Sequence, residues 1–67
     1  MSQERLYVIE VTKPQGRTLV GPWSTDKRIP QSWVRFVKSA YHGLPTRVRS
    51  FSRKQAQKIQ DNGGQLP

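Results

Sequence analysis

Residues 5–20 have the sequence RLYVIEVTKPQGRTLV, and this stretch decides the fold. Residues 5–12 are rich in β-branched and aromatic side chains and alternate as a strand does. The alternation puts two sets on opposite faces: Tyr7, Ile9 and Val11 on one, and Leu6, Val8 and Glu10 on the other. Pro14 and Gly16 then suit a tight turn, and residues 17–20 resume the strand pattern. The stretch therefore predicts a β-hairpin whose first strand is central in a sheet.

The hairpin is followed by a predicted loop and a helix. Gly21-Pro22 removes a donor from the ladder, which indicates a sheet edge or a bulge, so residues 23–29 are predicted to be a loop. From Pro30 onward, apolar residues recur at helical spacing until Gly43-Leu44-Pro45 ends the pattern. This predicts a helix over residues 30–42, although Phe36 lies off the apolar stripe and leaves a strand over residues 33–37 as an alternative.

The last part of the chain predicts a strand running directly into a helix. Residues 46–51 alternate, with Arg47, Arg49 and Phe51 on one face. Ser52 and Gln55 have the spacing of a capping box, which places the start of a helix at Ser52. This second helix is expected to bury Ala56 and Ile59 and to end at Asn62-Gly63-Gly64.

These elements predict one small α+β domain over residues 1–67. A β-hairpin and a third short strand pack against two helices in the order β-β-α-β-α, with fraying expected at residues 1–4 and 64–67. The chain has no cysteine, which excludes disulfides and thiolate metal sites and fits a reducing compartment. No apolar stretch approaches the length of a membrane span, and no signal peptide is visible. We expect a protein of the bacterial or host-cell cytoplasm that binds no membrane.

The sequence carries little that could support catalysis. His42 is the one histidine, expected to cap the end of the first helix, and the acids Glu4, Glu10, Asp26 and Asp61 have no spacing that pairs two of them in one site. The glycines match neither a P-loop nor a dinucleotide fingerprint. We therefore expect no enzymatic activity, no small-molecule substrate, no cofactor and no metal site.

The charge distribution gives the strongest indication of function. The net charge is +8, yet residues 1–26 hold three bases and three acids, and residues 27–60 hold nine bases and no acid. Such asymmetry is typical of a protein that binds a polyanion, and the neutral hairpin is expected to serve mainly as a scaffold. If the bases meet on one side of the fold, they form a continuous basic surface. The candidate polyanion-binding residues are Arg47, Arg49, Arg53, Lys54, Lys58, Arg35, Lys38, Lys27 and Arg28.

The large aromatic residues divide into expected core and expected surface. Trp33, Tyr41 and Phe51 are predicted to fill the core, because so small a domain has few other large residues. Trp23, in the predicted loop, and Phe36, off the helical stripe, are predicted to be exposed and are candidate apolar anchors.

Two functions follow from this distribution. The first is a non-catalytic module that binds nucleic acid through phosphate contacts with little base specificity, since no sequence-reading motif is present. The alternative is a regulator that docks its basic face on an acidic surface of a larger machine, such as RNA polymerase or a nuclease, and inhibits or redirects it. In length, absence of cysteine and lopsided charge, the chain is similar to small phage-encoded accessory proteins that act on a host machine. A monomer is expected, with dimerisation left open.

Overall fold

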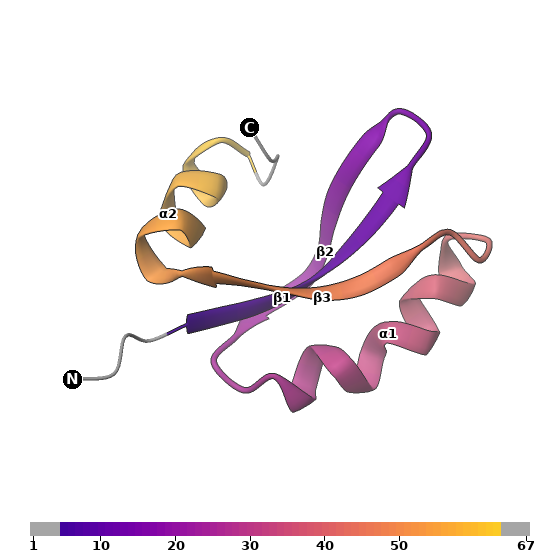
Figure 1. The fold of residues 1–67 in the computed structure, drawn as a ribbon, viewed down its shortest axis with the longest axis horizontal. Coiled ribbons are helices and arrows are strands. Elements are labelled where there is room, and N and C mark those ends of the chain that lie inside the picture. Colours follow the sequence, from indigo (N-terminus) through magenta and orange to yellow (C-terminus); the bar gives the residue numbers. More distant parts are fainter. Residues whose placement is uncertain (1–4, 64–67) are drawn as a thin grey trace.

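A computed structural model describes residues 5–63 of the protein, which form one antiparallel sheet and two helices. The spatial order of the strands is β2-β1-β3, so β1 is central as predicted (Figure 1). The elements are β1 (Arg5–Lys13), β2 (Gly16–Ser24), α1 (Arg28–Ala40), β3 (Thr46–Ser52) and α2 (Arg53–Asp61). The α+β class and the β-β-α-β-α order are confirmed. The fraying predicted at residues 1–4 and 64–67 lies outside the described residues.

The hairpin of β1 and β2 is longer than the sequence pattern predicts. Pro14 and Gln15 form its turn, and Gly16 follows with φ 139°, a backbone conformation that favours glycine. The register is irregular between Tyr7 and Ile9, and β2 continues past Gly21-Pro22 to Ser24. The loop predicted over residues 23–29 is therefore wrong at its start. An edge strand tolerates proline and a bulge, because its outer backbone groups have no partner strand to lose.

The two helices cover opposite faces of the sheet, as Figure 1 shows with α1 on one side and α2 on the other. Alternate residues of a strand point to opposite faces, so β1 contributes to two separate cores. Val8 packs with Phe51 and with Ala56 and Ile59 of α2. The other core joins Ile9 and Val11 of β1 to Val37 of α1, with Val20, Val34, Tyr41 and Leu44 packed against it. Surfaces on the two helices therefore face away from each other.

Helix α1 begins two residues before the predicted start and includes residues 33–37, which settles the alternative of a strand there. It ends at Ala40, and His42 and Gly43 follow with φ 59° and 78°. Gly43, which the sequence predicted to take a left-handed conformation, does so. Glycine adopts this conformation readily because it has no Cβ to clash with the backbone. His42 lies beyond the last turn of the helix, not in it as predicted.

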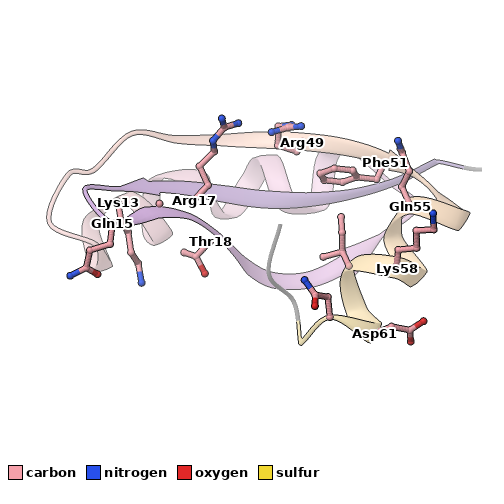
Figure 2. A pocket seen from close by; sticks show the side chains of 12 residues that line it. Lys13, Gln15, Arg17, Thr18, Arg49, Phe51, Gln55, Lys58 and Asp61 are labelled. Carbon is pink, nitrogen blue, oxygen red and sulfur yellow. The ribbon is translucent and has the colours of Figure 1, made fainter. Parts of the chain in front are cut away.

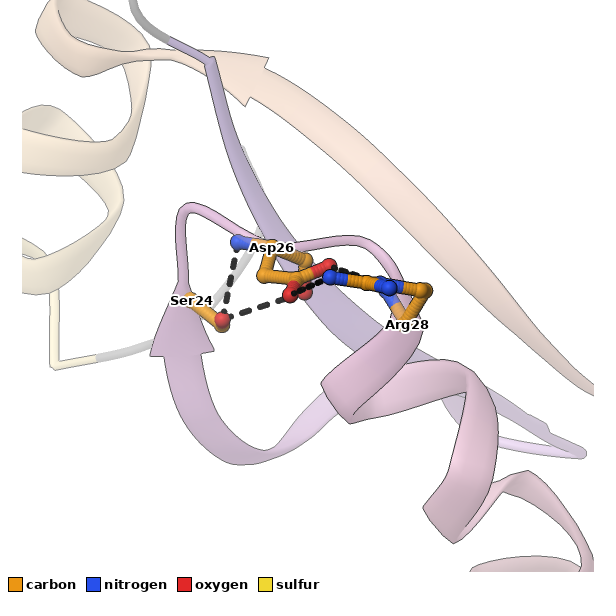
Figure 3. Close-up of polar contacts among 3 residues, drawn as sticks. All are labelled: Ser24, Asp26 and Arg28. Atoms are coloured by element: carbon orange, nitrogen blue, oxygen red, sulfur yellow. Dashed lines mark hydrogen bonds and ion pairs between the residues drawn. The ribbon is translucent and has the colours of Figure 1, made fainter.

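The partly buried carboxylate of Asp26 fixes the start of α1. The Asp26 carboxylate accepts hydrogen bonds from the backbone N–H of Arg28 at 2.9 Å and from its guanidinium at 3.1 and 3.2 Å (Figure 3). Ser24 Oγ accepts a bond from the Asp26 N–H at 3.0 Å and donates one to the Asp26 carbonyl. The side-chain hydrogen bond from Arg28, with its backbone bond, lowers the pKa of Asp26, and Asp26 raises that of Arg28.

The predicted capping box is present at the start of α2. Ser52 Oγ accepts a hydrogen bond from the backbone N–H of Gln55 at 3.2 Å, and Gln55 Oε1 accepts one from the backbone N–H of Ser52 at 3.2 Å. Ala56 and Ile59 are buried against the sheet, also as predicted. Because β3 ends where the capping box begins, the strand and the helix have a fixed relative orientation.

Candidate functional site

An open groove with a volume of about 1340 Å³ runs between the hairpin and α2, with β3 contributing to its lining. Figure 2 shows side chains of the hairpin at one end and side chains of α2 at the other. We call it the basic groove, because four bases and one acid line it. Its lining residues are Lys13, Gln15, Gly16, Arg17, Thr18, Arg49, Phe51, Gln55, Lys58, Ile59, Asp61 and Asn62.

A buried carboxylate organises the strand side of this groove. Glu10 of β1 is fully buried, a state that a carboxylate adopts only when it is paired. It accepts a hydrogen bond from Arg47 Nε at 3.0 Å and one from Arg49 Nη1 at 2.5 Å. The Cα of Glu10 lies opposite that of Arg47 in the sheet register, and Arg49 is the next residue of β3 on the same face. Two of the candidate polyanion-binding residues thus have an internal carboxylate as partner.

Arg49 is held from a second side. Its guanidinium carbon lies 5.1 Å from the centroid of the Phe51 ring, a cation–π geometry. The Phe51 ring also packs edge to face with Trp23, with the two ring centroids 5.7 Å apart. Arg47 and Arg49 together carry one positive charge more than Glu10. Arg49 is held in one position in the lining of the groove, with little conformational entropy left to lose on binding.

Two bases of the groove lining come from the hairpin, which the charge distribution predicted to be mainly a scaffold. Arg17 pairs with Thr12 in the sheet register, and Lys13 lies at the hairpin turn. Both line the basic groove. Strand alternation could have identified Arg17. Leu19 lies opposite Glu10 and on the same face of the sheet. Arg17 is two residues before Leu19 in β2, so it lies on that face as well. The Lys13 ammonium, however, lies over Tyr41, with Nζ 5.3 Å from the ring centroid. Tyr41 packs in the core on the α1 side of the sheet, so the charge of Lys13 is directed away from the groove.

Helix α2 contributes one of its predicted bases to the lining. Lys58 lines the groove beside Gln55 and Asp61, and the Asp61 carboxylate accepts a hydrogen bond from Gln57 at 3.0 Å. Lys54 and Arg53 are exposed on α2 and do not line the groove. The groove therefore joins bases of the hairpin to bases of β3 and α2, which lie far from the hairpin in the sequence.

The remaining candidate bases lie with α1, on the opposite side of the sheet. Arg35 and Lys38 are exposed on that helix, Lys27 precedes it, and Arg28 forms an ion pair with Asp26 at 3.1 Å. Helices α1 and α2 make no contact within residues 5–63. The structure thus brings only some of the candidate polyanion-binding residues together. The four bases of α1 and of the segment before it lie on the other side of the sheet, so the single continuous basic surface does not form.

The exposure of the two tryptophans is the reverse of that predicted. Trp23, predicted to be exposed, is partly buried against Phe51 because β2 continues through it and turns it toward α2. Trp33, predicted to be core, is 50% exposed. Phe36 is 67% exposed, as predicted, and Phe51 is buried and Tyr41 partly buried, as expected for core residues.

Other kinds of site are absent from the described part of the chain. No three side chains of His, Cys, Asp or Glu within residues 5–63 lie together in a way that would hold a metal ion. Neither α1 nor α2 is long and apolar enough to cross a membrane. No family model matches the chain, and comparison with curated proteins and with solved structures finds no similar protein. The basic groove and the exposed face of α1 are the two surfaces of the described residues that suit a binding partner.

Proposed function

We propose that the protein is a non-catalytic module that binds nucleic acid through phosphate contacts in the basic groove. The observation that carries this proposal is the convergence of Arg17, Arg49 and Lys58 on one groove whose lining includes one acid, Asp61. Like charges that converge in this way repel one another, and a polyanion removes that repulsion. Phosphate oxygens are the usual partners of Arg and Lys in nucleic-acid complexes.

The neutral side chains of the groove suit the same ligand. Gln15, Gln55, Asn62 and Thr18 line it together with the bases, and amide and hydroxyl groups commonly donate hydrogen bonds to phosphates. The aromatic residue in the lining, Phe51, is buried beneath Arg49. Base stacking requires an accessible ring, so binding through the backbone, with little base specificity, is favoured over reading of unpaired bases.

Salt dependence of affinity tests this proposal. Fluorescence anisotropy of a labelled DNA duplex, and in parallel of a single-stranded RNA, gives the affinity at a series of salt concentrations. Three phosphate contacts, from Arg17, Arg49 and Lys58, predict a slope of about −2.7 for log K against log salt on duplex DNA. A slope near zero, or no binding near physiological salt with either nucleic acid, would refute the proposal.

A matched pair of variants makes the test specific to the groove. Lys58→Gln removes a base that lines it, and Lys38→Gln removes one exposed base from α1, on the opposite side of the sheet. Both variants lower the net charge equally. We expect Lys58→Gln to reduce the salt slope by about 1 and Lys38→Gln to leave it unchanged. Equal effects would show that net charge alone drives binding.

A further inference from the structure

The exposed face of α1 carries a second feature that nucleic-acid binding leaves unused. Ile29, Trp33 and Phe36 are 46%, 50% and 67% exposed, and the rings of Trp33 and Phe36 meet edge to face with centroids 5.7 Å apart. Together with β2 they form a groove of about 260 Å³, which we call the apolar groove. Its lining residues are Ile9, Val20, Gly21, Pro22, Ile29, Pro30, Trp33, Phe36 and Val37.

This exposure follows from the width of the sheet. The apolar stripe of α1 extends from Val37 around the helix to Trp33 and Phe36, whereas the outer strands of a three-stranded sheet lie only about 10 Å apart. Val37 is buried over the sheet, and the aromatic flank projects beyond the edge strand β2. Adjacent exposed aromatic residues beside an apolar groove are typical of protein interaction sites.

The chemistry of the groove excludes several occupants. Its nine lining residues offer one side-chain hydrogen-bond donor, the Trp33 indole N–H, and no side-chain acceptor, which is too little to recognise the edge of a nucleobase. Its volume of 260 Å³ is below the roughly 300–1,000 Å³ of small-molecule sites. Apolar side chains of a polypeptide fit both its size and its lining.

The lining of the groove carries no charge, and the bases of α1 lie outside it. The charge of this helix and of the whole chain determines the kind of polypeptide. Residues 27–40 contain four bases and no acid, and with Arg28 paired to Asp26 the charges of Lys27, Arg35 and Lys38 remain. These charges act over about 8 Å at physiological ionic strength, a distance comparable with the diameter of a helix. A second copy of this chain, with a net charge of +8, would bring like charges together. An acidic partner would be attracted.

We propose that the apolar groove binds an acidic segment of another protein, whose apolar side chains pack between Trp33, Phe36 and Pro22. The basic groove lies on the opposite side of the sheet, so the protein can hold a nucleic acid and an acidic protein segment at the same time. This proposal does not depend on nucleic-acid binding, because the two surfaces share no residue.

Selection from a phage-displayed library of random peptides tests the proposal without assuming a sequence. The immobilised protein is the bait, and the double variant Trp33→Ser/Phe36→Ser serves for counter-selection. Both side chains are at least half exposed, so this variant is expected to fold, as circular dichroism would verify. The selected peptides are expected to combine acidic and apolar residues. Their affinity is expected to fall about 30-fold or more in the double variant, as at interaction hot spots.

Three outcomes would overturn the proposal. The first is enrichment of basic or neutral peptides, or no enrichment over the double variant. The second is a monomer–dimer equilibrium in sedimentation that disappears in the double variant, which would assign the groove to a second copy. The third is an oligonucleotide that shifts the NMR signal of the Trp33 indole N–H. Lys58→Gln is the matched control, since it alters the basic groove and is expected to leave peptide affinity unchanged.

Discussion

The buried carboxylate of Glu10 is expected to be the most sensitive charged position in the described part of the chain. Glu10→Gln keeps the size of the side chain but removes the charge that Arg47 and Arg49 share. One oxygen is also replaced by an NH₂ group, which cannot accept a hydrogen bond from a guanidinium. The variant therefore leaves at least one arginine donor without its acceptor, at a site where the mutated side chain has no access to water.

The expected cost follows from the two hydrogen bonds. A hydrogen bond to a charged group contributes about 1.5–3 kcal/mol. The low end applies here, because the side chains of Arg47 and Arg49 are 62% and 29% exposed and water can solvate them when the carboxylate is lost. Glu10→Gln loses one of these bonds, and the other keeps a neutral amide oxygen as its acceptor, so the variant is expected to lower the free energy of unfolding by about 2 kcal/mol. A chain of 67 residues has roughly 3–10 kcal/mol in total, so the loss is a large fraction.

Urea unfolding followed by circular dichroism measures this change. The arginines provide an internal scale: Arg49→Gln is expected to cost more than Arg47→Gln, because Arg49 is less exposed and also lies over Phe51. An unfolding free energy of Glu10→Gln within about 0.5 kcal/mol of the wild type would refute the reasoning. So would a reversed order of the two arginine variants.

Three further predictions concern the cap, the helix start and the tryptophans. Ser52→Ala removes the side-chain acceptor of the α2 capping box and is expected to lower the unfolding free energy by about 1 kcal/mol in the same urea assay. The pKa of Asp26 is lowered in the folded protein, so its contribution to stability is present above its ordinary pKa of 3.8 and is lost as pH falls through the lower folded value. Asp26→Asn should thus be less stable than wild type at pH 7, and unfolding across an acid series should show the difference disappear. Acrylamide should quench the fluorescence of Trp23→Phe, which retains exposed Trp33, more strongly than that of Trp33→Phe.

The local signals in the sequence predicted most of the fold. The alternation of residues 5–12 placed Glu10 and Val8 on one face, and the capping box placed the start of α2 at Ser52. Both depend on interactions between residues close in sequence, which a single sequence contains. The end of β2 was missed because a bulge at an edge strand allows Gly21-Pro22 to remain within the strand.

The candidate site was harder to predict because it depends on which face each helix covers. Helical spacing groups Trp33 with Val37, but it does not show how far a three-stranded sheet extends beneath the helix. Nor does the net charge of a segment show that Arg17 of the neutral hairpin joins Lys58 of α2. The partnership of Glu10 with Arg47 and Arg49 depends on the register of β1 and β3, which is set by tertiary structure.

The most direct test of the account is to map a short DNA duplex onto the protein by NMR at low salt. We expect the backbone amide signals of Arg17, Arg49 and Lys58 to shift as the duplex is added, since these residues line the basic groove. The indole N–H of Trp33, on the opposite side of the sheet, should remain unchanged. Shifts concentrated on α1, with the groove signals unmoved, would contradict the assignment of nucleic-acid binding to the basic groove.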